Sequence, residues 1–322
     1  MFGIVVIGRN EGERLRRCLQ SLPASASIVY VDSGSSDNSI ALASEYSAEI
    51  VELDVHKPFT AARARNAGFK RLQERFPQID YVQFIDGDCT LIPSWPAKAV
   101  AFLESNQRVC AVFGRRRERH PDQSIYNQLC DWEWEGSSTG EVAAFGGDVM
   151  IRATVFAQLG GYRDELIAGE EPELCFRLRS ARWQIWRLDT DMTTHDACMT
   201  SLSQWWKRAM RSGYAFAQGA SMHGASPERY RIWETRRAWL WGLWIPLIGV
   251  LLAFQFGPIG MLFLTIYPIQ FLRQLARNKG TLQERSLRAL FQLLARFPES
   301  IGQLKFSYDQ AFKQQTRIIE YK

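Results

Sequence analysis

The stretch YVQFIDGD at residues 81–88 combines an apolar run with two acidic residues that follow it. The apolar part, Tyr81 to Ile85, has the composition of a buried strand, so Asp86 and Asp88 are expected at the end of that strand. Gly87 between them lets a ligand approach closely, and two carboxylates at this spacing suit a hard divalent cation that also binds phosphate oxygens. A polar turn is the alternative interpretation, because Asp and Gly are also common turn residues.

Segments on the N-terminal side of this stretch alternate between strand and helix patterns. Strand-like segments occur at residues 3–7, 28–31 and 49–53, and helix-like segments at 11–21, 37–46 and 61–76. This alternation, with short polar connections, predicts a doubly wound α/β fold. Open parallel sheets bind ligands outside the carboxyl ends of their strands, which is where Asp86 and Asp88 are expected.

The pattern is less regular farther along the chain. Residues 115–141 are charged, rich in Trp and irregular, residues 142–151 indicate a strand interrupted by glycines, and residues 177–186 indicate a helix that leads into a strand. No internal repeat or low-complexity tract is found.

The composition excludes several classes of protein. With 322 residues, 46% of them hydrophobic and 23% charged, the chain can bury a sizeable core in one large or two ordinary domains, and it is not a disordered protein. The net charge of +5 does not require nucleic acid, and we predict none as a partner. The six cysteines occur singly, without a Cys-x-x-Cys pair, which argues against a zinc ribbon or a disulfide scaffold.

The N-terminus leads directly into a strand-like run and does not resemble a signal peptide, so we expect the soluble part in the cytoplasm.

Two neighbouring segments, residues 238–254 and 256–272, are almost wholly apolar. Each holds about 17 residues, roughly 25 Å of helix against a hydrocarbon core of about 30 Å, so each is marginal as an upright span and a thin hairpin or re-entrant pair is expected. Basic residues on both sides of the pair place both ends on the cytoplasmic side, and three Trp residues suit an interfacial belt. Two buried helices of a large soluble domain are the alternative. The basic residues are Arg236, Arg237, Arg273, Arg277 and Lys279, and the belt is Trp239, Trp241 and Trp244.

A third region follows the apolar pair. Residues 282–297 have the pattern of an amphipathic helix, which fits a helix lying on anionic lipid or a packed surface helix. We therefore predict a catalytic domain at residues 1–235, a membrane-embedded hairpin or re-entrant segment at 236–273, and amphipathic juxtamembrane helices at 274–322. The predicted location is the cell inner membrane, with the catalytic domain on the cytoplasmic side.

Three N-terminal motifs together resemble the nucleotide-binding half of the family-2 glycosyltransferases. They are VVIGRNEG at residues 5–12, VYVDSGSSD at 29–37 and ARNAG at 64–68, and DGD at 86–88 matches the Asp-x-Asp motif of that family. The resemblance implies the GT-A fold, a Rossmann-like and mostly parallel sheet that binds a nucleotide-diphosphate sugar. It also implies Mn²⁺ or Mg²⁺ as the cofactor, held on the diphosphate by the Asp-x-Asp motif.

The resemblance assigns roles on the donor side. One departure concerns Asp32-Ser33, because many members carry two acidic residues there, which leaves the base less certain; locally these two residues also suit a turn and a helix cap. By position in the motifs, the base and ribose pocket is lined by Asn10 and Glu11, the nucleoside is contacted by Asp32, the nucleotide by Arg65, the sugar and ribose by Asp86, and the metal by Asp88.

Two downstream motifs resemble the acceptor side of the same family. They are FGGD at residues 145–148, in which Gly147 is expected to line the donor, and GEEPEL at residues 169–174. The second acidic position of the latter is the family's general base, so the resemblance assigns this role to Glu171, with Glu170 beside the acceptor. Glu replaces the usual Asp here, which requires the backbone to lie about one methylene farther back. Acidic residues that favour a helix N-terminus are the alternative.

The resemblance continues beyond the acidic motif. His195 corresponds to the histidine that completes the metal site with Asp88, although a lone histidine is often a surface or core residue. The stretch QWWKR at residues 204–208 differs at its last two positions from the Gln-x-x-Arg-Trp of processive synthases, which favours transfer of one sugar per encounter. Trp205 and Trp206 are expected to close over the acceptor or to pack at the membrane face.

The sequence therefore predicts an inverting, metal-dependent glycosyltransferase. Its donor is a nucleotide-diphosphate sugar, a UDP-sugar by preference, and its acceptor is a hydroxyl of a lipid-linked molecule or a polysaccharide. A sugar nucleotidylyltransferase would need a glycine-rich phosphate loop with Lys or Arg after the first strand, whereas residues 8–12 are short and include Glu11. A membrane-anchored scaffold that binds nucleotide sugars through a degenerate site is the other alternative, and the presence of all the acidic motifs argues against it.

Overall fold

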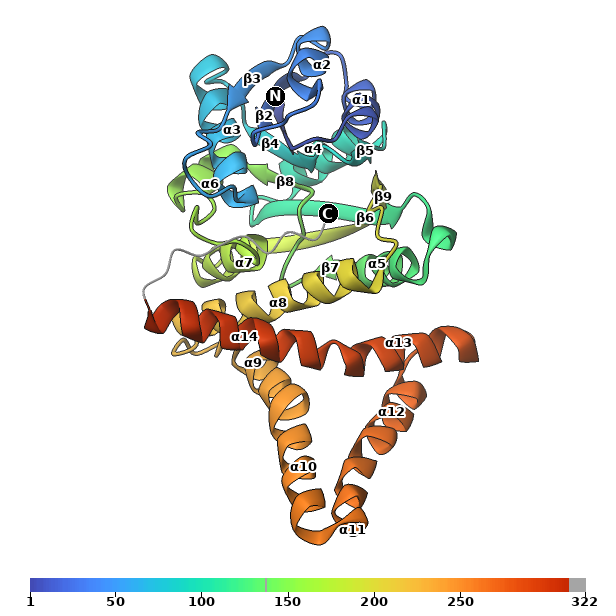
Figure 1. The fold of residues 1–322 in the computed structure, drawn as a ribbon. Helices are drawn as coiled ribbons and strands as arrows, with labels where there is room; N and C mark the ends of the chain where they lie inside the picture. Colours follow the sequence, from blue (N-terminus) through green and yellow to red (C-terminus); the bar gives the residue numbers. More distant parts are fainter. Residues whose placement is uncertain (137, 313–322) are drawn as a thin grey trace. The chain divides into compact units, whose positions relative to one another are not determined.

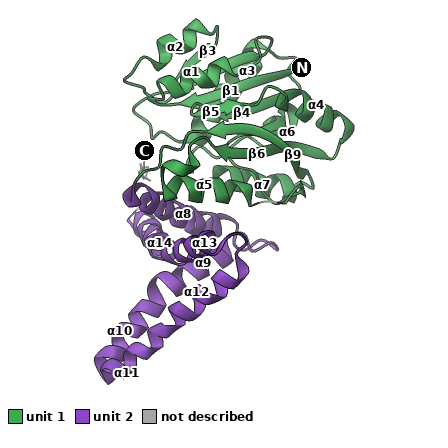
Figure 2. Ribbon diagram, turned by 90° about the vertical axis from the view of Figure 1, so that its right-hand side faces the viewer, with its two compact units in different colours: residues 1–200 green, residues 201–322 purple. Residues whose placement is uncertain are grey.

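The computed structural model describes residues 1–136 and 138–312 (Figure 1). The chain divides into two compact units, residues 1–200 and 201–322 (Figure 2). Helix α8 (Leu202–His223), which the sequence analysis included in the catalytic domain, belongs to the second unit. The division into catalytic, membrane and juxtamembrane segments remains a prediction, and residues 313–322 of the last segment lie outside the described residues.

The first unit is built on one mixed sheet with the strand order β3-β2-β1-β4-β8-β6-β9-β5, and β7 pairs with β9. Strands β1 to β4 run parallel to one another, as the alternating pattern predicts. The strands are β1 (Phe2–Gly8), β2 (Ser27–Asp32), β3 (Glu49–Glu52), β4 (Tyr81–Asp86), β5 (Cys89–Leu91), β6 (Val109–Glu118), β7 (Gly140–Glu141), β8 (Val149–Arg152) and β9 (Gln184–His195).

The register of the parallel strands brings the candidate residues to one edge of the sheet. Ile7 pairs with Asp86 and Gly8 with Asp32, so β1, β2 and β4 end at the same level. Apolar residues at the centres of these strands are fully buried and form the core. The helices of this unit are α1 (Glu13–Gln20), α2 (Ser39–Glu45), α3 (Ala61–Arg75), α4 (Trp95–Ser105), α5 (Ile125–Glu135), α6 (Ala153–Gln158) and α7 (Glu170–Ser180), with the 3-10 turn η1 (Pro121–Gln123).

The prediction of an irregular segment at residues 115–141 is wrong. Strand β6 continues to Glu118 and helix α5 follows it. The charged residues of β6 are compatible with a strand because carboxylates from distant segments pair with them; Arg115 contacts Asp191 at 2.8 Å, and Arg117 contacts Asp131 at 2.9 Å. The strand predicted at 142–151 begins only at Val149, since the glycines before it form a loop.

Residues 201–312, the described part of the second unit, form helices and the loops that join them. Two helical arms, Ile232–Phe256 and Pro258–Arg277, are joined at Gly257 and are long and apolar enough to cross a membrane, by length and composition alone. Helix α8 packs closely on α14, where a Cβ at Gly213 would lie 2.0 Å from the carbonyl oxygen of Glu299. The further helices are α9 (Ile232–Trp239), the π segment η2 (Leu240–Trp244), α10 (Ile245–Phe256), α11 (Pro258–Met261), the 3-10 segment η3 (Leu262–Thr265), α12 (Ile266–Arg277), α13 (Leu282–Leu294) and α14 (Arg296–Ala311).

Helix α3 lies against the parallel strands through Gly68, and this close approach predicts a stability effect. A Cβ at position 68 would lie 2.4 Å from Cγ1 of Val5 and 2.8 Å from Cγ2 of Val31, both of which are fully buried. We expect Gly68→Ala to destabilise the protein by about 1–3 kcal/mol despite the better helix propensity of Ala. Thermal unfolding of the detergent-purified protein measures this. Lys70→Ala on the exposed side of α3 is the control, and an equal effect of both variants would contradict the packing argument.

Candidate active site

The loops that follow β1 and β2 are held together by side chains that the sequence analysis assigned to nucleoside binding. The backbone N–H of Asn10 donates to Ser35 Oγ at 2.9 Å, and Asn10 Oδ1 accepts from the backbone N–H of Ser36 at 2.7 Å. The carboxylate of Asp32 is buried and accepts from the backbone N–H groups of Gly34 and Ser35 at 2.9 and 2.7 Å. Asn10 and Asp32 thus fix the loop structure, and their contact with a nucleoside remains a prediction.

Glu11 lies in the first of these loops. Its carboxylate pairs with Arg14 at 2.9 Å, and its side chain is 12% exposed. The loop also approaches the Asp-x-Asp turn, because a Cβ at Gly87 would lie 3.4 Å from Cγ of Glu11. The structure therefore brings Glu11 next to the turn that carries Asp86 and Asp88.

At the edge of the sheet where the parallel strands end, the guanidinium of Arg65 on α3 is the centre of a cluster of charged side chains. It is buried and contacts three carboxylates, those of Asp86 at 2.9 Å, Glu170 at 3.0 Å and Glu171 at 3.1 Å. It also lies over the ring of Tyr162, 5.5 Å from the ring centroid. Burial opposes the charge of Arg65, but the carboxylates outweigh burial and raise its pKa. One cation therefore joins the end of β4 to the start of α7.

Asp86 is held by two arginines. Besides Arg65, Arg116 on β6 contacts Asp86 at 3.3 Å. Burial disfavours the ionised form, but Arg65 and Arg116 lower the pKa of Asp86 below its ordinary value, so it is a carboxylate at neutral pH. Gly147 lies directly against this group, because a Cβ there would be 2.6 Å from Asp86 Oδ2 and 2.9 Å from Arg65 Nη2.

The pKa of Glu171 is shifted in the opposite direction from that of Asp86. Burial raises the pKa of its carboxyl to about 7, the neighbouring Glu170 adds to this effect, and Arg65 opposes it. Both acidic residues belong to the first turn of α7, which begins after Gly169 in a left-handed conformation with φ 78°. Glu171 therefore exchanges its proton near neutral pH, while its contact with Arg65 fixes its position.

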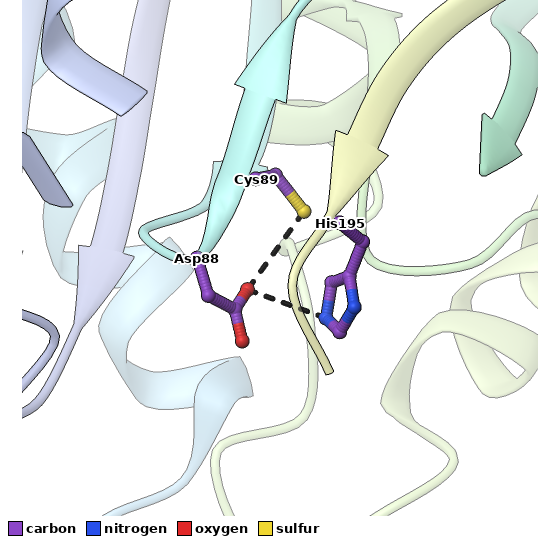
Figure 3. A group of neighbouring side chains, drawn as sticks. All are labelled: Asp88, Cys89 and His195. Atoms are coloured by element: carbon purple, nitrogen blue, oxygen red, sulfur yellow. Dashed lines mark hydrogen bonds and ion pairs between the residues drawn. The ribbon is translucent and has the colours of Figure 1, made fainter. Parts of the chain in front are cut away.

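Asp88 and His195 come together although more than a hundred residues separate them. Strand β5 pairs with β9 in antiparallel register, with Cys89 opposite His195. The side chains of Asp88 and His195 are buried, and Asp88 Oδ1 lies 3.3 Å from His195 Nε2 (Figure 3). An oxygen and an imidazole nitrogen suit Mn²⁺ or Mg²⁺ better than a soft thiol does, so Cys89, whose Sγ lies 3.8 Å from Asp88 Oδ1, is the less suitable donor of the three.

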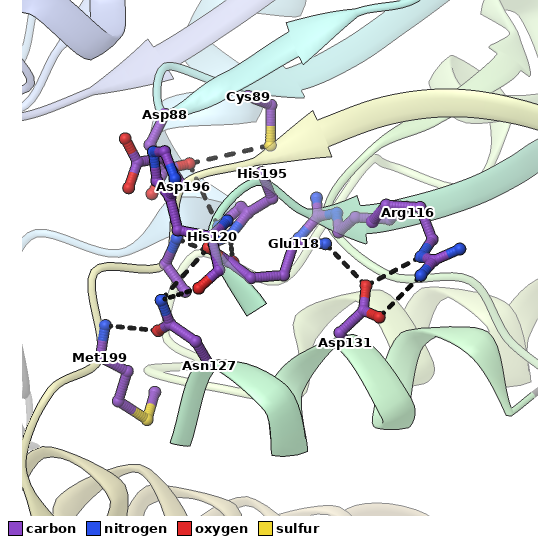
Figure 4. A network of polar contacts seen from close by, with 12 residues as sticks. Asp88, Cys89, Arg116, Glu118, His120, Asn127, Asp131, His195, Asp196 and Met199 are labelled. Carbon is purple, nitrogen blue, oxygen red and sulfur yellow. Dashed lines mark hydrogen bonds and ion pairs between the residues drawn. The ribbon is translucent and has the colours of Figure 1, made fainter. Parts of the chain in front are cut away.

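Several buried residues around His195 were not identified from the sequence. Glu118 at the end of β6 has Oε2 3.7 Å from His195 Nδ1, and the same oxygen accepts from the backbone N–H of Ala197 at 3.1 Å (Figure 4). Asn127 on α5 donates to the carbonyl oxygen of His120 at 3.0 Å and accepts from the backbone N–H of Met199 at 2.9 Å. These contacts hold the end of β9, and with it the ring of His195.

The sequence motifs also gave no role to Arg116 or Asp148. Asp148 is buried, contacts Arg116 at 2.7 Å, and accepts from the backbone N–H of Asp86 at 3.1 Å and from Thr193 Oγ1 at 2.6 Å. The cluster of arginines at 115–119 and the acidic end of the FGGD motif were visible in the sequence. Their pairing was not, because the partners belong to segments that are distant in sequence.

The two tryptophans proposed for the acceptor side lie on α8 in the second unit. Trp205 is 7% exposed and packs edge-to-face on Phe291 of α13, with ring centroids 4.9 Å apart. Trp206 is partly exposed. Packing within the second unit accounts for Trp205, and a role of either residue at the acceptor remains a prediction.

A mixed sheet whose parallel strands end at a cluster of acidic and arginine side chains agrees with the GT-A fold that the sequence predicts. Residues 3–159 match the family described as glycosyl transferase family 2. The chain thus carries a family-2 glycosyltransferase domain and is a glycosyltransferase. None of the curated protein sequences compared with the chain matches it.

Solved structures show the same fold. A mannosyltransferase from Pyrobaculum calidifontis, in complex with GDP-Man and Mn²⁺, is 15% identical with a TM-score of 0.61, covering 96% of this chain and 87% of that one. Residues 1–349 of TarS from S. aureus are 15% identical with a TM-score of 0.51, covering 96% and 91%. Glucosyl-3-phosphoglycerate synthase from Mycobacterium tuberculosis, with Mg²⁺ and UDP, is 18% identical with a TM-score of 0.50, covering 70% and 79%. At these identities the likeness concerns the fold.

The contact of Gly147 with Asp86 predicts a sharp difference between two adjacent glycines. A methyl group at position 147 must displace the Asp86 carboxylate or the arginines around it, whereas one at position 146 meets nothing within 4 Å. We expect Gly147→Ala to lower kcat/KM for a nucleotide sugar by about 100-fold, since displacements of about 1 Å at a reacting centre have effects of this size. Gly146→Ala should retain most of the activity. Equal losses in the two variants would show that Asp86 does not require this close approach.

Proposed function

We propose that the chain transfers a sugar, with inversion, from a nucleotide-diphosphate donor to a hydroxyl group of a lipid-linked or saccharide acceptor. The observation that carries the proposal is the Arg65 cluster, in which one buried guanidinium contacts Asp86 on the donor side and Glu171 on the acceptor side. The pKa of Glu171 near 7 supports its role as the general base. The sugar would lie between the two carboxylates.

The proposed reaction is a single displacement. Glu171 takes the proton of the acceptor hydroxyl, and the oxygen of that hydroxyl forms a bond to the anomeric carbon from the face opposite the leaving group. The bond from the anomeric carbon to the diphosphate oxygen breaks, and its electron pair leaves with the nucleoside diphosphate. An alpha-linked donor therefore gives a beta-linked product. Arg65 keeps Glu171 in place during this step, and Asp86 positions the sugar and ribose through their hydroxyl groups.

Asp88 and His195 are the residues proposed to hold Mn²⁺ or Mg²⁺. Their convergence from β5 and β9, as an oxygen and a nitrogen donor 3.3 Å apart, supports this assignment. Such an ion would neutralise the charge that develops on the departing diphosphate, an effect worth several kcal/mol. Glu118, which lies beside the other nitrogen of His195, would keep the ring in the orientation that presents Nε2.

The proposed donor is a UDP-sugar, and the proposed acceptor is attached to a lipid. We propose UDP as the nucleotide, with Asn10, Glu11 and Asp32 lining its pocket; one structural neighbour is in complex with UDP and another with GDP-Man. The two apolar arms of the second unit support an acceptor attached to a lipid and a location at the cytoplasmic face of the inner membrane. The divergent QWWKR stretch supports transfer of one sugar per encounter, and Glu170 is proposed on the acceptor side.

Replacing the proposed base tests the mechanism. Glu171→Gln should lower kcat by about 10³-fold while donor binding remains, because the amide keeps the shape of the side chain but cannot take a proton. Glu171→Asp should restore part of the rate. The control is Glu165→Gln, an exposed residue that pairs with Arg163 outside the cluster. Retention of the full transfer rate in Glu171→Gln, measured as release of nucleoside diphosphate with acceptor present, would exclude Glu171 as the base.

The pKa of Glu171 also predicts the pH dependence of transfer. The groups that face it are Glu170 on α7, Arg65 on α3, Asp86 on β4 and Tyr162, and their balance with burial leaves its pKa at about 7. Below this value Glu171 carries a proton and cannot act as a base, so kcat should fall about tenfold per pH unit as the pH decreases and level off above pH 7. A kcat that does not change between about pH 5.5 and 8.5 would contradict this assignment.

Metal removal tests the pair Asp88 and His195. Chelation by EDTA should abolish turnover, and added Mn²⁺ should restore it. Binding of Mn²⁺ in the presence of nucleoside diphosphate, measured by the electron paramagnetic resonance signal of the free ion, should weaken at least about tenfold in Asp88→Asn. Asp122→Asn, at an exposed site in η1, is the matched control. Unchanged Mn²⁺ affinity in Asp88→Asn would place the ion elsewhere.

A further inference from the structure

The second unit differs strongly in charge from the first. Residues 201–322 contain 17 Lys and Arg against 6 Asp and Glu, a formal charge of +11, whereas residues 1–200 contain 22 against 28, a charge of −6. Four exposed basic residues lie at the ends of the arms that are far from the turn: Arg236 is near the start of the first arm, Arg273 and Arg277 are near the end of the second, and Lys279 lies just beyond it. No acidic residue occurs between Glu234 and Glu284. We call these four basic residues the basic collar, and their charge is the one expected for contact with anionic lipid headgroups.

The helix Pro258–Arg277 as a whole has the length to cross a membrane, but its uncharged stretch is shorter than the hydrocarbon core. From Ala238 to Phe256 the first arm has 19 uncharged residues, about 28 Å of helix. From Pro258 to Leu272 the second arm has 15, about 22 Å, against a hydrocarbon core of about 30 Å. A tip that reached the far headgroups would draw Arg273 into the hydrocarbon, which is costly.

The tip exposes apolar side chains together with one polar side chain, that of Gln255. Phe254 is 91% exposed, Ile259 74% and Leu262 64%, and Phe256 beside them is also exposed. Trp239, Trp241 and Trp244 all lie near the charged end of the first arm, whereas Trp, Tyr, Lys and Arg are missing between residues 245 and 266. An interfacial belt therefore exists at one end of the hairpin and not at its tip.

The turn is suited to an apolar surrounding. Within residues 232–277 only Gly257 lies outside helical structure, and the next residue, Pro258, has no backbone N–H to satisfy. The N–H of Gly260 donates to the carbonyl oxygen of Gly257 at 3.0 Å. The arms meet closely here, since a Cβ at Gly260 would lie 2.0 Å from the carbonyl oxygen of Leu252 and one at Gly249 would lie 2.3 Å from Leu264. Pro258 and the hydrogen bond between Gly260 and Gly257 thus reduce the number of backbone groups at the turn that need water.

From these observations we infer that the hairpin of residues 238–272 enters the membrane from one side, turns inside the hydrocarbon at Gly257 and Pro258, and returns to the same side. Its basic collar then lies on the anionic headgroups of that leaflet. The inference rests on the membrane association in the proposed function and not on glycosyl transfer.

The test uses fluorescent labels at the tip and at the base of the hairpin. In the full chain, Cys198→Ser removes the exposed cysteine and leaves five buried ones. An NBD label is then attached at Ile259→Cys or, as the control, at Lys279→Cys, both exposed positions. Each protein is reconstituted into vesicles of phosphatidylcholine and phosphatidylglycerol. Dithionite, which destroys NBD only where water reaches it, is added outside and then again after a pore-forming toxin has opened the vesicles.

The inference predicts that the label at 259 survives both additions, whereas the label at 279 is lost completely after the second. Lipids that carry a spin label deep in the acyl chain should quench the label at 259 more strongly than lipids labelled near the headgroup. Loss of the label at 259 from the side opposite to that of 279 would show a hairpin that spans the bilayer and would overturn the inference. Loss from the same side, or protection without quenching by lipid, would also overturn it, because the tip would then lie in water or against protein.

Nucleotide-sugar turnover of the same two labelled proteins separates this inference from the proposed function. Turnover with a tip that fails the dithionite test rejects the re-entrant hairpin alone. A protected and lipid-quenched tip without turnover of any donor supports the hairpin and counts against the proposed transfer reaction.

Discussion

The candidate active site depends on one buried cation with three carboxylate partners. A buried guanidinium is stable only where opposite charges and hydrogen bonds compensate its loss of hydration, and Arg65 obtains this compensation from Asp86, Glu170 and Glu171. These residues come from β4 and α7, so the ion cluster fixes the distance between the end of a strand and the start of a helix far away in sequence. The same cluster gives two carboxyl groups different protonation behaviour. Asp86, between two arginines, stays ionised, whereas Glu171, buried beside Glu170, titrates near pH 7.

The sheet topology provides the second half of the site. Strand β9 is long enough to pair with β6 over most of its length and with β5 at its end, and this double pairing brings His195 to Asp88. Glu118, at the end of β6, is therefore next to the His195 ring without any local sequence relationship to it. The ring of Trp134 also contacts the imidazole edge-to-face, with 4.7 Å between the centroids. The geometry of this pair thus follows from strand register, while that of the Arg65 cluster follows from charge compensation.

The parallel half of the fold could be predicted from the sequence because its strands are short apolar runs separated by polar turns, and both the pattern and the family motifs point to the same edge. Residues that belong to local motifs, such as Asp86, Asp88 and Glu171, could be assigned candidate roles for this reason. Strand β6 was missed because its second half contains three consecutive arginines, Arg115 to Arg117, instead of apolar residues. Their carboxylate partners lie in other segments. Arg116, Glu118 and Asp148 owe their places to tertiary pairing, which a single sequence does not reveal. The local interpretation of Asp32 as a turn residue describes its observed contacts, and the nucleoside role assigned to it remains a prediction.

A crystal structure with Mn²⁺ and a nucleoside-diphosphate sugar, using the anomalous signal of manganese, would locate the metal and the sugar relative to the Arg65 cluster. We expect an anomalous peak between Asp88 Oδ1 and His195 Nε2, with the diphosphate beside it and the anomeric carbon on the side of Glu171. We also expect Arg65 to keep its contact with Glu171 in the complex. A peak at another place, or a sugar that lies away from the Arg65 cluster, would contradict the claim that this edge of the sheet carries out glycosyl transfer.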